Sequence, residues 1–196
     1  MPFNRLLTTL LACSALLLGA CSPKDSPTTD TSKPAKQEIS VDAVAAQAKG
    51  FTVGALMSAH TVYVFFDPQC PHCGHLWQAS IPLHKKMKFV WVPVAWINAS
   101  STPQGAALLA AANPQELMTQ HEESLLSGKG GITAPTSITA EIEKSIKANT
   151  ALLNSFGAES VPFVVAKNAR SGQTVSRNGA MTTAALAELA GLDAAP

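Results

Sequence analysis

The sequence has few charged residues and almost no excess of either sign. Lysine and arginine number 14 and aspartate and glutamate 13, so the formal net charge is +1 and charged residues make up 14% of the chain. Proteins that bind nucleic acids carry a basic stripe or patch that faces the phosphates. The chain shows no such stripe, so we do not expect nucleic acid as a partner.

Cysteine is also scarce, because only four occur in 196 residues. Cys13 lies in an apolar leader and Cys21 directly follows it, which leaves Cys70 and Cys73 for the folded body. An exported protein is free to form structural disulfides, but the only pair available here has just two residues between its cysteines. We therefore expect the core to stand without a structural disulfide.

The first twenty residues are expected to be a secretory signal peptide. Arg5 supplies the positive charge, residues 6–18 are mostly apolar, and small residues come before Cys21. The apolar run is too short for a membrane span. Its ending, Leu18-Gly-Ala-Cys21, resembles a bacterial lipobox, which implies diacylglycerol on Cys21, and Ser22 after it implies the outer membrane. The alternative is an ordinary signal peptide that leaves Cys21 free.

Three parts of the chain are therefore predicted. Residues 1–20 form the signal peptide, and residues 21–38, rich in Ser, Pro, Thr, Lys and Asp, form a flexible tether that cannot bury enough apolar surface to fold. Residues 39–196 form one catalytic domain, about the size of an ordinary single domain.

The most informative motif is Cys70-Pro71-His72-Cys73, which follows the strongly apolar run Thr61–Phe66. Two cysteines at this spacing can close a disulfide and reopen it by thiol exchange. At the start of a helix, the first sulfur faces free backbone N–H groups and the positive end of the helix dipole, and both favour the thiolate. Pro71 suits the first helical turn because its missing N–H costs nothing there. The motif predicts a redox site.

Apolar patterning predicts an α/β chain. The expected elements are a helix at 39–48, a strand at 61–66, a helix at 70–86 that Pro82 kinks or shortens, a strand at 89–97, helices at 106–112 and 117–126, a loop at 127–137, a helix at 139–156, strands at 163–167 and 173–177, and a helix at 182–190. This order, β-α-β, a helical insertion, then α-β-β-α, indicates a thioredoxin-like fold with a helical insertion.

The stretch Val62–Cys73 resembles the catalytic domain of the periplasmic thiol:disulfide interchange proteins of the DsbC and DsbG type, and Ala106–Pro114 resembles their helical insertion. The resemblance covers roughly residues 41–192. It implies that Pro162 is a cis-proline beside the cysteine pair and that Val161 and Pro71 help bind the substrate. It also implies no cofactor, client proteins with cysteines or disulfides, and a membrane redox partner.

Three departures from that family matter. Thioredoxin and DsbA place a buried acid six residues before the first cysteine, whereas Val64 stands there in this chain, so proton transfer must use water or another group. The N-terminal dimerisation domain of DsbC and DsbG has no room before Thr61, so we expect a monomer. The CPHC tetrapeptide is typical of DsbA rather than DsbG, and we expect His72 to stabilise the Cys70 thiolate.

Several other residues are candidates for a role near the cysteine pair, and some of them allow two interpretations. Asp67 either opposes the thiolate or caps the loop, and the loop role is favoured. His75 is expected to be a partly exposed helix residue. The motif cysteines with His72 and His75 have the residue types of a metal site, although Cys73 should point inward. Surface positions are expected for His60, His84 and His121, and core positions for Trp77, Trp91 and Trp96, with Trp77 the best candidate for a binding groove.

The sequence thus predicts a periplasmic, lipid-anchored thiol–disulfide oxidoreductase in which Cys70 attacks and Cys73 resolves the mixed disulfide. The family resemblance favours a DsbG-like reductase or isomerase, whereas CPHC favours a DsbA-like dithiol oxidase. A copper-binding or metal-delivery module is the alternative from another class.

Overall fold

The computed structural model describes residues 37–193. The predicted signal peptide, Cys21 and nearly all of the predicted tether lie outside the described residues. Within the described range, no helix is both long and apolar enough to cross a membrane.

A five-stranded sheet in the order β1-β3-β2-β4-β5 forms the centre of the fold. Strands β2 and β3 are parallel, and the other neighbouring pairs are antiparallel. Parallel neighbours need a crossover connection, and α2 with the 3-10 turn after it supplies this one. The strands are β1 (Phe51–Gly54), β2 (Thr61–Phe66), β3 (Lys88–Pro93), β4 (Phe163–Lys167) and β5 (Thr174–Asn178).

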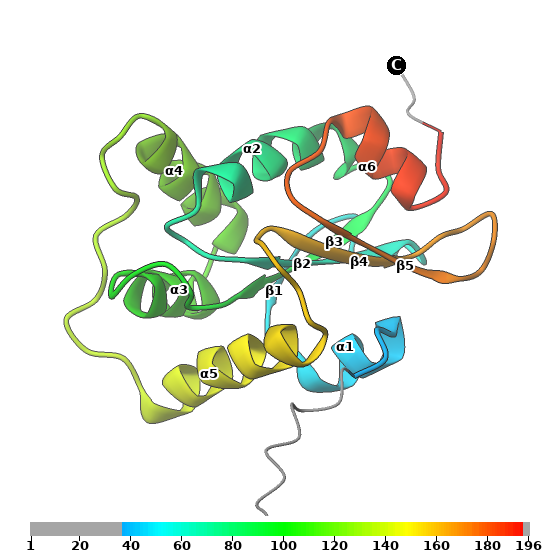
Figure 1. Ribbon diagram of the computed structural model, residues 1–196. Coiled ribbons are helices and arrows are strands. Elements are labelled where there is room, and N and C mark those ends of the chain that lie inside the picture. Colours follow the sequence, from blue (N-terminus) through cyan, green and yellow to red (C-terminus); the bar gives the residue numbers. More distant parts are fainter. Residues whose placement is uncertain (1–36, 194–196) are drawn as a thin grey trace, which may run out of the picture. The chain divides into compact units, whose positions relative to one another are not determined.

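Helices cover both faces of the sheet (Figure 1). They are α1 (Val41–Gln47), α2 (Pro71–Ser80), α3 (Ser101–Ala110), α4 (Pro114–Leu126), α5 (Ala140–Ser155) and α6 (Thr183–Leu189). Helix α2 packs between α4 and α6 on one face, whereas α1 and α5 contact each other on the opposite face. Helices α3 and α4 are the insertion, and α4 brings it against α2.

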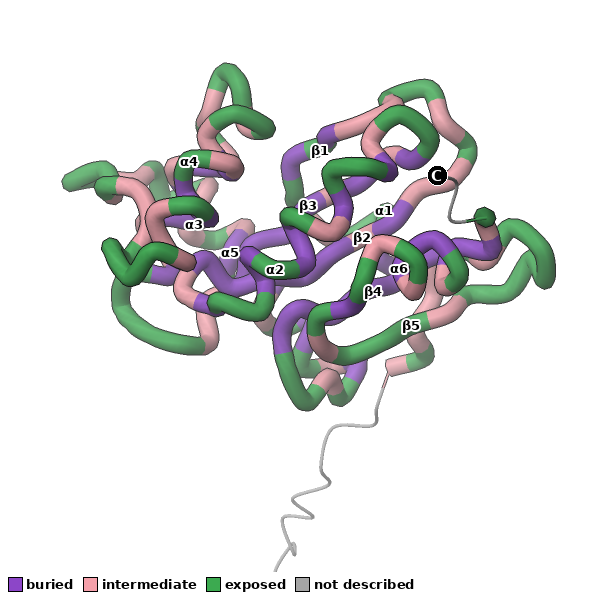
Figure 2. The backbone as a smooth tube through the Cα atoms, turned by 90° about the horizontal axis from the view of Figure 1, so that it is seen from above, coloured by how far each residue is buried: buried purple, intermediate pink, exposed green. Residues whose placement is uncertain are grey.

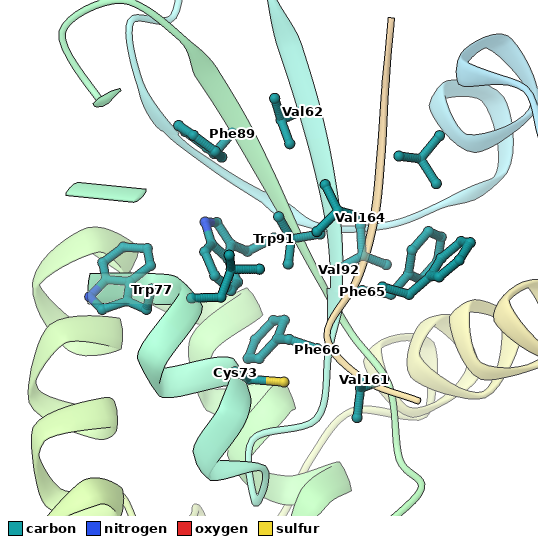
Figure 3. Close-up of a cluster of buried hydrophobic side chains, with 14 of the residues drawn as sticks. Val62, Phe65, Phe66, Cys73, Trp77, Phe89, Trp91, Val92, Val161 and Val164 are labelled. Carbon is teal, nitrogen blue, oxygen red and sulfur yellow. The ribbon is translucent and has the colours of Figure 1, made fainter. Parts of the chain in front are cut away.

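The core lies between the sheet and these helices, where the buried segments of β2, β3 and β4 run through the middle of the fold (Figure 2). Aromatic rings meet edge to face in it: the Trp77 and Trp91 rings are 5.2 Å apart and the Phe66 and Trp91 rings 5.4 Å apart. Such pairs contribute about 0.5–1.5 kcal/mol each beyond their area burial. Cys73 belongs to the same buried cluster (Figure 3).

Most predicted elements are present within a few residues of their expected bounds, and α2 ends before Pro82, where a 3-10 turn at Ile81–Leu83 follows. Strand β1 was missed because it is only four residues long, follows Gly50 and ends in Gly54, and gains its partners only by pairing with β3. The bounds of α3 were also wrong. It begins at Ser101 and not at Ala106, with Ser100 at its N-cap.

Candidate functional site

The two cysteines lie where β2 leads into α2. Cys70 is the N-cap residue of α2 in extended conformation, and Pro71 occupies the first helical position. The Cys70 carbonyl accepts the first helical hydrogen bond from the Cys73 amide at 2.9 Å. This geometry directs the sulfur of Cys70 toward the free N–H groups of the first turn. Both cysteines are thiols in this structure.

The surroundings of Cys70 favour its thiolate. The hydrogen bond from the Cys73 thiol contributes most to lowering the pKa of Cys70 from 9.0 to about 6, against the opposing effect of burial. Hydrogen bonds from the backbone amides of Cys73 and His72 lower it further. At neutral pH, Cys70 is therefore mainly the thiolate, which is the nucleophilic form of cysteine.

Cys73 has the opposite character. It is fully buried, and Figure 3 shows its sulfur directed from α2 into the apolar cluster. Burial raises the pKa of Cys73 well above its usual value, and the hydrogen bond to Cys70 and the charge of that thiolate raise it further. The pair is thus divided into a reactive thiolate near the surface and a protonated thiol below it.

The loop before β4 forms the other side of the site. The Val161–Pro162 peptide bond is cis, as the family resemblance implied. The Cys70 sulfur lies 3.5 Å from the Val161 carbonyl oxygen and donates to it when protonated, a contact that joins residues 91 positions apart. Antiparallel pairing of β4 with β2, in which Phe163 lies opposite Phe65, holds this loop beside the cysteine pair.

His72 and His75 lie on the exposed side of α2, and their rings are 6.2 Å apart. The charge of His72 is the smallest of the contributions that lower the pKa of Cys70, behind the backbone amide of the same residue. His72 therefore acts on the thiolate more through its position at the helix start than through its ring. Within residues 37–193, no group of three or more His, Cys, Asp and Glu side chains is arranged to hold a metal ion.

Asp67 organises the loop between β2 and α2. It is fully buried, and its carboxylate accepts hydrogen bonds from the Ser101 hydroxyl at 2.7 Å and from the Gln69, Trp96 and Ile97 amides at 2.8, 2.6 and 2.9 Å. These bonds join the loop to the connection that follows β3 and to the start of α3. The structure thus places Asp67 in the loop-capping role.

The helical insertion holds the same loop from its other side. Gln104 on α3 accepts a hydrogen bond from Gln69 at 2.5 Å, and the His121 ring on α4 bonds the Pro68 carbonyl at 2.7 Å. The expected surface position of His121 was wrong, because the ring is fully buried between Pro68 and the Ile132 amide. The insertion therefore fixes the position of the Cys70 loop.

The tryptophans belong mainly to the core. Trp77 and Trp91 are buried, so Trp77 does not form a binding groove, whereas Trp96 is half-buried and donates its indole N–H to Asn154 at 3.1 Å. One residue near the cysteines was missed altogether. Glu122 on α4 is a buried carboxyl group close to α2, and the only sequence signal for it was indirect: the apolar Val64, where related proteins place an acid.

This fold and this site define a thioredoxin-like protein with a dithiol pair at the start of α2. No protein-family model matches the chain. The chain is similar to two curated proteins, both the thiol:disulfide interchange protein DsbG. It is 32% identical to the Pseudomonas aeruginosa protein, over 70% of this chain and 54% of the relative. It is also 32% identical to the Escherichia coli protein, over 53% of this chain and 42% of the relative. The chain thus spans about half the length of the curated relatives it matches.

Solved structures show the same fold at lower identity. A periplasmic thioredoxin-like protein from Salmonella enterica serovar Typhimurium aligns with a TM-score of 0.61 and 18% identity, over 79% of this chain and 97% of that one. The thiol-disulfide exchange protein alpha-DsbA2 from Wolbachia pipientis aligns with a TM-score of 0.58 and 17% identity, over 76% and 90%. These likenesses confirm the predicted thioredoxin-like fold.

Proposed function

We propose that this protein is a thiol–disulfide oxidoreductase that acts on cysteines of other proteins through Cys70 and Cys73. The observation that carries the proposal is the contrast between the two sulfurs: a thiolate at the helix start and a buried, protonated thiol three residues later. Thiol–disulfide exchange requires an attacking thiolate and a resolving thiol. The similarity to DsbG supports the same activity.

In the reducing direction, the Cys70 thiolate attacks a client disulfide and forms a mixed disulfide, and one client sulfur leaves as a thiolate. Cys73 then loses its proton and attacks Cys70, which closes the Cys70–Cys73 disulfide and releases the second client thiolate. The oxidising direction is the reverse sequence. In both directions, the Val161 carbonyl, 3.5 Å from the Cys70 sulfur, lies where a client backbone would pass, so Val161, Pro162 and Pro71 shape the client site.

For the physiological direction we propose a DsbG-like reductase or isomerase, because the curated relatives are DsbG proteins. A membrane redox partner would keep the pair reduced. A DsbA-like oxidase is the second candidate, since a low pKa of Cys70 stabilises the reduced form and so makes the disulfide more oxidising. The redox state of the pair in living cells separates them: mostly thiols for a reductase or isomerase, and mostly disulfide for an oxidase.

We further propose that the protein works in the periplasm on a lipid anchor at Cys21, most simply in the outer membrane. The lipobox-like ending Leu18–Cys21 supports this location. Metabolic labelling with a radioactive fatty acid should mark the wild type and leave Cys21→Ser unlabelled. A labelled Cys21→Ser protein would contradict the assignment.

Trapping of mixed disulfides tests the proposed activity. The Cys73→Ala protein should accumulate disulfide-linked complexes with client proteins, because Cys70 still attacks and nothing resolves the product. Cys70→Ala should accumulate none, and the double variant serves as the control. Complexes trapped by Cys70→Ala instead would reverse the roles of the two cysteines, and none with either variant would refute the function.

A further inference from the structure

The carboxyl group of Glu122 is buried at a position where it does not stabilise the fold. Its side chain is 1% exposed, and neither carboxyl oxygen has a hydrogen-bond partner among residues 37–193. A buried polar group without a partner destabilises a fold, and a buried charge does so more strongly. Packing therefore does not explain an acid at this position. A role in the chemistry of the neighbouring dithiol on α2 would explain it.

The carboxyl group lies against the residue that follows Cys73. Helix α4 runs beside α2 (Figure 1), and a Cβ atom added to Gly74 would lie 2.7 Å from Glu122 Oε2. Only a glycine in α2 allows this approach. The pKa values of these groups also reflect their closeness. Glu122 contributes to raising the pKa of Cys73. Burial is the larger cause of the raised pKa of Glu122, and the charge of the Cys70 thiolate is the second.

Helix α2 and its N-cap, which pack against α4, carry four titratable residues: Cys70 and Cys73, which are buried, and His72 and His75, which lie on the exposed side of the helix. Besides α2, helix α4 packs against α3 and β1, and neither of these elements contains a titratable residue. The neighbouring His121 directs its ring nitrogens to the Pro68 carbonyl and the Ile132 amide. A proton on Glu122 therefore exchanges most directly with the dithiol.

We propose that Glu122 accepts the proton of Cys73 when Cys73 attacks the mixed disulfide. This inference rests on the proposed function. The proton moves from the Cys73 thiol to the Glu122 carboxylate, directly or through one water molecule. The Cys73 thiolate then forms a bond to Cys70 Sγ, the bond from Cys70 to the client sulfur breaks, and the client leaves as a thiolate. Glu122 afterwards returns its proton to solvent.

The charge of Cys70 sets the timing of this transfer. In the reduced protein, burial and then the charge of the Cys70 thiolate raise the pKa of Glu122. Formation of the mixed disulfide removes the negative charge from Cys70, so the pKa of Glu122 falls from its raised value while burial still holds it up. The ionised fraction of Glu122 is therefore larger at the stage when Cys73 must be deprotonated than it is in the reduced protein.

Reaction of the reduced protein with one equivalent of 5,5′-dithiobis(2-nitrobenzoate) separates the two steps. The attack of Cys70 releases the first nitrothiobenzoate, and the attack of Cys73 on the resulting mixed disulfide releases the second. Glu122→Gln should leave the first phase within about twofold of wild type. It should slow the second at least about tenfold near pH 7, because general-base catalysis contributes about 10²–10⁴-fold. The second phase of the variant should also rise with pH where the wild type is level.

Glu122→Asp should restore part of the second phase, and Glu123→Gln, which changes an exposed carboxylate on the same helix, should match the wild type in both phases. Should Glu122→Gln not fold, carboxyl ¹³C NMR of the wild type gives the answer: Glu122 should be protonated at neutral pH in the reduced protein and titrate lower once Cys70 is blocked as a mixed disulfide. A wild type without two phases would refute the proposed function. Two normal phases in Glu122→Gln, or a Glu122 signal indifferent to Cys70, would overturn this inference alone.

Discussion

Cys70 and Cys73 are three positions apart in the chain, but their surroundings differ more than that spacing suggests. Cys70 is 5% exposed at the helix start beside the Val161 carbonyl, whereas Cys73 is fully buried among apolar side chains. The same hydrogen bond between them lowers the pKa of Cys70 and raises that of Cys73. One interaction thus makes the two sulfurs unequal, in the sense that the proposed attacking role of Cys70 and resolving role of Cys73 require.

The thiolate of Cys70 makes the stability of the reduced protein depend on pH. Because its folded pKa of about 6 lies below the ordinary 9.0, the unfolded chain binds more protons between these values, and stability rises with pH across that window. Each pKa unit is worth about 1.4 kcal/mol, so the rise is at most about 4 kcal/mol. Urea denaturation of the reduced protein at several pH values should show it, and Cys70→Ser should not. A flat profile in the wild type would contradict the lowered pKa.

Glu122 produces the opposite dependence. Its folded pKa is raised, so the native protein holds a proton that the unfolded chain loses above the ordinary pKa, and stability falls as the pH rises toward the folded value. The Glu122→Gln protein lacks this loss. Its stability relative to wild type should therefore increase as the pH rises above the ordinary glutamate pKa of about 4.3. Equal profiles for the two proteins would mean that the carboxyl group is not held protonated.

At the scale of elements, the loop between β2 and α2 is held by other parts of the fold rather than by its own sequence. Asp67 joins it to the connection after β3 and to the start of α3, and His121 on α4 bonds the Pro68 carbonyl. The insertion helices therefore do more than cover α2. They fix the position from which Cys70 begins its helix.

Substitution of Asp67 should test that arrangement. Asp67→Asn replaces one acceptor oxygen by a donor that faces amide or hydroxyl donors, so at least one buried group loses its partner. We expect a loss of about 2–3 kcal/mol, since bonds to charged groups contribute about 1.5–3 kcal/mol each. Asp42→Asn, an exposed carboxylate in the first turn of α1, should cost less than about 1 kcal/mol. Equal losses in urea denaturation would show that the Asp67 bonds contribute little.

The sequence was sufficient for features that depend on neighbouring residues. The CPHC motif after an apolar strand predicted Cys70 at a helix start, and the long amphipathic helix at 139–156 was found almost to the residue. The partners of Asp67 and the burial of His121 and Glu122 depend on contacts between residues about 30 to 50 positions apart, for which no local pattern exists. Strand β1 is of the same kind, because its pairing with β3 defines it.

At the scale of the whole molecule, one copy of the chain contains every part of the described site. The dithiol, the cis-proline loop and Glu122 all come from the same 37–193 unit, so exchange with a small disulfide requires no second copy. We expect a monomer by light scattering of the soluble form without residues 1–21. The rate of reduction of a peptide disulfide per molecule should not change with protein concentration. A rate that rises with concentration, together with a dimer mass, would show that a second copy completes the site.

The place of Cys70 at the helix N-cap also makes the backbone of α2 a reporter of the redox state. The backbone amide of His72 stabilises the Cys70 thiolate, and this interaction is strongest when the sulfur carries a full negative charge. Once the sulfur enters a disulfide, the charge is gone and the amide is held less firmly. Hydrogen–deuterium exchange at this single amide should therefore quicken on oxidation, while amides in the middle of β2 keep their rate. Deuterium uptake at the first turn of α2 would then report whether the pair is a dithiol or a disulfide, with no chemical label on either cysteine.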